Sequence, residues 1–88
     1  MKTYLTVMFN SDGGRPSEVA QRLYMMGFRP THGNYDFVYD WGNTEVSVDE
    51  AVVFADRVHE ALRGMNVHFK LETQIYKSGG EVDEEDVL

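Results

Sequence analysis

Apolar and polar residues alternate along three stretches of the chain, at residues 2–9, 35–41 and 67–76. Alternation with a period of two is typical of a β-strand that has one buried face. The first stretch carries apolar residues at both odd and even positions, which favours a central strand. A fourth stretch, residues 28–32, contains Pro30, which cannot donate a hydrogen bond to a neighbouring strand. We therefore expect a poor strand there, at the edge of the sheet.

Two further stretches carry apolar residues at intervals of three and four, a spacing typical of amphipathic helices. The first helix is predicted to have Ser17 as its N-cap and to end at Gly27 in a Schellman motif. The second is predicted to start with a capping box formed by Ser47 and Glu50, and to end at Gly64. Its buried side is predicted to consist of Val48, Ala51, Val52, Ala55, Val58 and Leu62.

The predicted elements follow the order strand, helix, strand, strand, helix, strand, which resembles the order in ferredoxin-like domains. The two middle strands are expected to form a hairpin at Gly33 and Asn34, and right-handed β-α-β connections then give the strand order 4-1-3-2. The clean alternation of the last strand places both helices on one face. The predicted fold is an α+β two-layer sandwich with a four-stranded antiparallel sheet, formed by residues 1–77 as a single domain.

The net charge of −7 is concentrated near the C-terminus. Residues 1–77 have a net charge of −2, whereas residues 78–88 hold five acids and no bases, which predicts a flexible acidic tail. The near-neutral body lacks the clustered basic residues that nucleic acid requires. Neither a membrane-spanning run nor a secretory pattern is present, and the chain has no cysteine. We therefore expect a cytoplasmic protein with no membrane or nucleic-acid partner.

The connection after the first strand is the one segment with candidate chemistry. Gly13, Gly14, Arg15 and Ser17 lie between a strand and a helix, where backbone amides, the helix N-terminus and the guanidinium group can hold a small anion. The spacing matches neither a P-loop nor a dinucleotide fingerprint, so an ordinary turn is the competing interpretation. Asp12 is an alternative metal-binding acid, but it has no carboxylate partner nearby in the sequence.

The remaining polar residues do not converge on a catalytic set. Asp36 and Asp40 share a strand face but are about 13 Å apart, too far to act together. His32, His59 and His68 fall on three separate elements without the spacing of a metal site. No catalytic residue, metal or cofactor is therefore predicted, and we expect a protein without enzymatic activity.

The sheet face that no helix covers is expected to carry apolar residues. Tyr4, Met8, Val38 and Tyr76 are predicted to lie there, and an apolar patch of this kind marks an interaction surface. We therefore expect association through this open face, as a homodimer or as a subunit of a larger assembly, with itself or another protein as the partner. Addition of a strand at a sheet edge is a second route to association. The alternative is a phosphate- or anion-binding enzyme or sensor that uses the loop between the first strand and the first helix.

Overall fold

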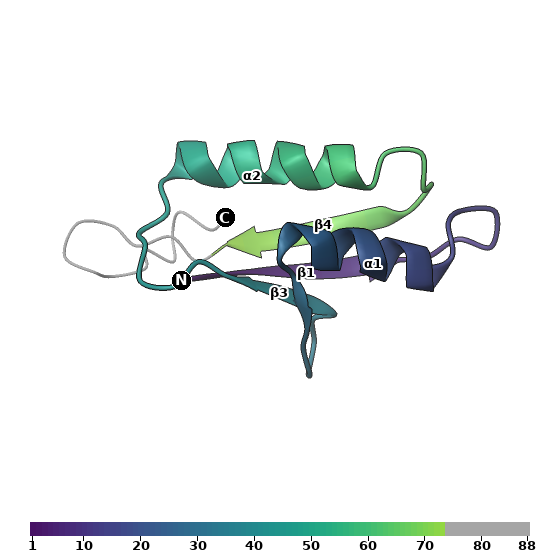
Figure 1. Ribbon diagram of the computed structural model, residues 1–88, viewed down its shortest axis with the longest axis horizontal. Helices are drawn as coiled ribbons and strands as arrows, with labels where there is room; N and C mark the ends of the chain where they lie inside the picture. Colours follow the sequence, from purple (N-terminus) through teal and green to yellow (C-terminus); the bar gives the residue numbers. More distant parts are fainter. Residues whose placement is uncertain (74–88) are drawn as a thin grey trace.

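The computed structural model describes residues 1–73 of the chain. This part contains two helices and four strands in the predicted order (Figure 1): β1 (Lys2–Met8), α1 (Pro16–Met26), β2 (Arg29–Pro30), β3 (Phe37–Asp40), α2 (Val48–Ala61) and β4 (His68–Thr73). The strands form one antiparallel sheet with the order β2-β3-β1-β4. This is the predicted order 4-1-3-2, counted from the other edge. The predicted α+β sandwich is therefore confirmed, with the Pro30 strand at one edge.

A single hydrophobic core lies between the sheet and both helices. Its buried residues include Leu5, Val7 and Phe37 of the sheet, Val19 and Leu23 of α1, and Phe54 and Val58 of α2. Because both helices contribute to this one core, they cover the same face of the sheet. Alternate residues of β1, such as Tyr4 and Thr6, point to the other side, which we call the open face.

Helix α1 begins at Pro16, with Arg15 as its N-cap. The prediction of Ser17 as the N-cap is therefore wrong. Proline is well suited to the first helical position, because its fixed φ matches the helix and its missing N–H is not needed there. The carboxylate of Glu18 accepts a hydrogen bond from the backbone N–H of Arg15 at 3.4 Å, which satisfies the N-cap amide.

The end of α1 agrees with the prediction. Gly27 lies in the left-handed region, with a φ of 106°. The N–H of Gly27 donates to the carbonyl of Tyr24 and the N–H of Phe28 donates to the carbonyl of Leu23, both at 3.0 Å. These two bonds define a Schellman motif, which turns the chain directly from α1 into β2.

Helix α2 starts as predicted, and Val58 and Leu62 of the predicted stripe are buried, but other positions of the stripe are not. Glu50 N–H donates to Ser47 Oγ at 3.1 Å and Ser47 N–H donates to Glu50 Oε1 at 3.3 Å, which confirms the capping box. Val48 and Val52 are 61% and 55% exposed, so their assignment to the core is wrong. Phe54, which the predicted stripe omits, is buried instead. A phenyl ring buries more apolar area than a valine, so the helix turns its aromatic residue to the core.

The connection between β2 and β3 is wider than the predicted two-residue turn. Gly33 has a φ of 91°, but Asn34 does not adopt the positive φ that the tight turn requires. The last strand pair is Pro30 with Phe37, and residues 31–36 form a loop. Tyr35 therefore precedes β3 and does not follow its alternation.

The predicted acidic tail, residues 78–88, and the predicted end of the last strand lie outside the described residues. Within residues 1–73, no helix is long and apolar enough to cross a membrane.

Candidate functional site

The open face brings together three of the predicted interface residues. The strand register places Tyr4 between Val38 of β3 and Glu72 of β4, and it places Met8 beside His68. Met8 is 67% exposed, while Tyr4 and Val38 are half-buried. Tyr76, the fourth predicted interface residue, lies outside the described residues.

Tyr35 also lies on the open face, which the sequence pattern did not predict. Its ring stacks on Tyr4, with the ring centroids 4.7 Å apart and the planes at 28°. Its hydroxyl donates to Glu72 Oε2 at 2.7 Å, and Lys70 Nζ lies 3.4 Å from Glu72 Oε1. The alternation in residues 35–41 puts Tyr35 on the same side as Phe37, Tyr39 and Trp41, which predicts that it is buried with them. Because residues 31–36 form a wide loop, Tyr35 lies on the open face instead. The one sequence feature that pointed to such a loop is the order Gly33-Asn34, which is a weaker signal for a tight hairpin than Asn-Gly.

Asp36 has a structural role that its position in the sequence did not reveal. Its Oδ2 accepts a hydrogen bond from the N–H of Val7 at 2.9 Å, and its own N–H donates to the carbonyl of Leu5 at 3.0 Å. The side chain thus continues the pairing of β1 past Phe37, the first residue of β3. Asp36 is exposed, and its carboxylate has this structural contact with β1 in addition.

The hydrogen bond between Tyr35 and Glu72 shifts both pKa values. The tyrosine hydroxyl, with a smaller contribution from Lys70, holds the pKa of Glu72 below its ordinary value of 4.5, although desolvation acts in the opposite direction. The same hydrogen bond, together with desolvation and the charge of Glu72, raises the pKa of Tyr35 above 10.0. The lowered Glu72 pKa adds stability above about pH 4.5, which is lost as the pH falls through the folded-state pKa. The raised Tyr35 pKa adds stability below about pH 10, which is lost as the pH rises through its folded-state pKa.

Replacement of Tyr35 by phenylalanine is expected to raise the pKa of Glu72 towards its ordinary value, because the hydrogen bond from the hydroxyl is the largest cause of the shift. A titration of the Glu72 carboxyl carbon followed by NMR measures this change. Lys70→Gln is the control and is expected to raise the same pKa by less. A Glu72 pKa that Tyr35→Phe leaves unaltered would contradict the position of Tyr35 on the open face.

The glycine loop after β1 packs against the connection between α2 and β4. The N–H of Gly14 donates to the carbonyl of Met65 at 2.7 Å, and the N–H of Gly13 donates to the carbonyl of Asn10 at 2.9 Å. A Cβ atom at Gly13 would lie 2.5 Å from the Met65 carbonyl oxygen. Close approach of two backbone segments therefore accounts for the glycine at position 13.

The other two residues of the predicted anion site, Arg15 and Ser17, are exposed at the start of α1. The N–H of Arg15 is already bonded to the carboxylate of Glu18, which also brings a negative charge to this end of the helix. Anion binding at this loop stays a prediction. Within residues 1–73, no three histidine or acidic side chains are placed to hold a metal ion.

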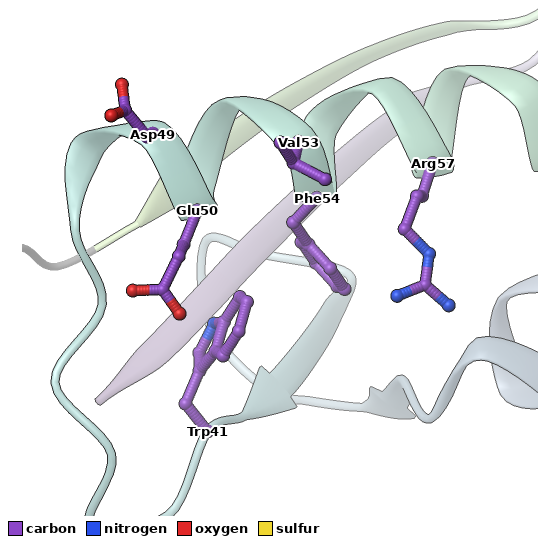
Figure 2. Close-up of a pocket in the computed structure, with 6 residues that line it drawn as sticks. All are labelled: Trp41, Asp49, Glu50, Val53, Phe54 and Arg57. Carbon is purple, nitrogen blue, oxygen red and sulfur yellow. The ribbon is translucent and has the colours of Figure 1, made fainter.

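A groove lies between α2 and the residue that follows β3 (Figure 2). It has a volume of about 290 Å³, and its lining consists of Trp41, Val53 and Phe54 together with the charged residues Asp49, Glu50 and Arg57. The Trp41 ring meets that of Phe54 edge to face, with the centroids 4.9 Å apart. No pocket was predicted from the sequence, because Phe54 was absent from the predicted buried side of the second helix.

The fold and these surfaces define a small α+β domain with one open sheet face and one apolar groove on the helix side. No family model, curated protein or solved structure matches the chain. The function is therefore argued from the surfaces themselves.

Proposed function

We propose that this protein works through association with a second copy of itself along the sheet. The observation that carries the proposal is the charge pattern of β4, the strand at the sheet edge opposite β2. Among residues 1–73, no strand pairs with the outer edge of β4. The backbone N–H and C=O groups of such an edge are a template for another strand.

The side chains of β4 are complementary to a second copy of the same strand. When two β4 strands pair antiparallel with Leu71 opposite the second copy's Leu71, Lys70 of each copy faces Glu72 of the other. Lys70 and Glu72 pair with each other at 3.4 Å within the strand, and their side chains are 73% and 46% exposed, so this exposed pair can be exchanged for pairs across the two strands. Directly opposed charges of opposite sign contribute about 0.2 to 1 kcal/mol per cross-strand pair.

Two exposed valines of α2 support the same arrangement. Val48 and Val52 are one helical turn apart and largely exposed. Arg57 lies on the flank of α2 that faces Trp41 of the groove, and the helical spacing puts Val48 and Val52 on the flank away from Arg57. Pairing of two β4 edges brings these flanks towards each other, and burial of the valines stabilises the pair by about 25 cal/mol per Å² of apolar surface.

The open face stays uncovered in this arrangement. The two sheets then form one continuous surface that carries Tyr4, Tyr35, Val38 and Met8 from each copy. A further protein can pack on this apolar and aromatic surface, which is how the pair serves as a subunit of a larger assembly.

Size-exclusion chromatography with light scattering tests the proposal. The unaltered protein is expected to have the mass of a dimer at micromolar concentration. Lys70→Glu is expected to give a monomer, because it places carboxylates opposite each other across the two strands. Met8→Glu is the matched control: it adds an acid to the open face away from the outer edge of β4, and the dimer is expected to persist.

Two outcomes would contradict the proposal. One is an unaltered protein that has the mass of a monomer throughout the micromolar range. The other is a Lys70→Glu variant that stays dimeric while Met8→Glu becomes monomeric, because the contact would then lie on the open face and not at the β4 edge.

A further inference from the structure

We propose that the groove beneath α2 is a binding site for a small apolar carboxylic acid, a property separate from association. The apolar body of the ligand lies against Trp41, Val53 and Phe54, and its carboxylate pairs with Arg57. Three features of the groove indicate this class of ligand: an apolar wall, a positively charged arginine at one end and two acidic residues at the other.

The wall of the groove is fixed in place before any ligand arrives. Trp41 Nε1 donates to Thr3 Oγ1 at 2.8 Å, and that hydroxyl lies 2.7 Å from Thr73 Oγ1. The polar atom of the indole is thus satisfied within the protein, so the ring offers apolar surface to the groove. Val53 also lines the groove and is 59% exposed, so the groove leaves apolar surface for a ligand to cover.

Arg57 supplies the positive charge at one end. Figure 2 shows its side chain extending from α2 beside Phe54. The ion pairs within residues 1–73 join Arg63 to Glu60 and Lys70 to Glu72, so none of them uses Arg57. The fork of a guanidinium group matches the two oxygens of a carboxylate and binds both of them at once.

Two acidic residues, Asp49 and Glu50, lie at the other end of the groove, so the part of the ligand that lies there must be uncharged. Glu50 is seven residues before Arg57, which is about 10 Å along the helix. The carboxylate of Glu50 is occupied by Ser47, whose N–H and hydroxyl lie 3.3 and 3.0 Å from Oε1. Together with Asp49 it repels a second anionic group. A ligand with one carboxylate and an apolar body therefore fits, and a polyanion does not.

Octanoate is a suitable probe, because Trp41 is the one tryptophan of the chain and its fluorescence reports on the groove. Octanoate is expected to change this fluorescence saturably, with a Kd of about 0.1 to 1 mM for a ligand of about ten non-hydrogen atoms. Octanamide has the same apolar chain without the charge and is expected to bind about fivefold more weakly.

Two variants locate the carboxylate. Arg57→Gln is expected to weaken octanoate binding about fivefold while leaving octanamide unaffected. Arg63→Gln is the matched control, an exposed arginine beyond the end of α2, and is expected to leave both ligands unaffected.

Three results would overturn the proposal: no saturable change up to about ten times the expected Kd, equal binding of octanoate and octanamide, or an octanoate affinity that Arg57→Gln leaves unaltered. Dimerisation is tested by the mass of the protein without ligand, whereas this site is tested by fluorescence. A negative result in one experiment therefore leaves the other proposal unaffected.

Discussion

Phe54→Ala is expected to lower the free energy of unfolding by about 3 to 5 kcal/mol. Phe54 is 5% exposed, and its ring centroid lies 5.7 Å from that of Phe28, 4.7 Å from that of Tyr39 and 4.9 Å from that of Trp41. Truncation removes the α2 ring that packs against these three aromatic residues. The aromatic neighbours are held by the sheet and collapse only partly into the space, so a cavity remains beneath the helix.

Val52→Ala is the matched control on the same helix. Both variants are made in the Lys70→Glu background, which is expected to be a monomer. Val52 is 55% exposed, and its truncation is expected there to change the free energy of unfolding by about 0.5 kcal/mol or less. Urea unfolding followed by far-ultraviolet circular dichroism measures both variants, independently of Trp41. Equal losses in the two variants would contradict the observed orientation of α2 and favour the stripe predicted from the sequence.

Gly13→Ala is expected to lower the free energy of unfolding by about 1 to 3 kcal/mol. The added Cβ would lie 2.5 Å from the carbonyl oxygen of Met65 and 2.7 Å from that of Asn66. Both are backbone atoms of the connection between α2 and β4, so the clash is relieved only if one of the two backbone segments moves. That movement would also disturb the hydrogen bond from Gly14 to Met65.

Gly14→Ala is the control for this prediction. It replaces a glycine of the same loop, but its added Cβ meets a side chain and not backbone atoms. The atom nearest to its added Cβ is Met65 Sδ, at 2.6 Å. Methionine is flexible and can change rotamer, so the loss of stability is expected to be smaller than in Gly13→Ala. The same urea unfolding experiment compares the two variants. A larger loss in Gly14→Ala would contradict the packing of this loop.

Local signals predicted the fold well because each one acts within a few residues. Ser47 and Glu50 form their capping box, and Gly27 ends α1 without reference to the rest of the chain. Pro30 cannot donate to a central strand, so it placed its strand at an edge of the sheet. The order of the strands then followed from the connections between elements.

Apart from the N-cap of α1, where Arg15 and not Ser17 precedes the helix, the errors concern residues whose position depends on tertiary contacts. The valines of α2 fit an apolar stripe as well as Phe54 does, and only the aromatic residues of the sheet decide which side is buried. Tyr35 follows the alternation of β3 in the sequence, but its contacts with Tyr4 and Glu72 draw it to the open face. The carboxylate of Asp36 accepts a hydrogen bond from Val7, which lies 29 residues earlier in the chain, and no local sequence pattern predicts this contact.

The candidate sites were predicted less completely than the fold. Alternation placed Tyr4, Val38 and Met8 on one face, as the structure does. To predict the groove, one would need to know which side of α2 faces the sheet and where Trp41 lies. Both depend on tertiary contacts. The complementarity of β4 required the knowledge that Lys70 and Glu72 lie on an outer strand, which follows from the sheet order and not from the alternation of β4 itself.

Mixing two charge variants tests association through β4 most directly. Lys70→Glu leaves two acids on the strand and Glu72→Lys leaves two bases, so each variant alone is expected to have the mass of a monomer by light scattering. An equimolar mixture is expected to have the mass of a dimer, because every acid on one strand then faces a base on the other. A mixture that stays monomeric, or a single variant that is dimeric alone, would contradict pairing of the two β4 edges.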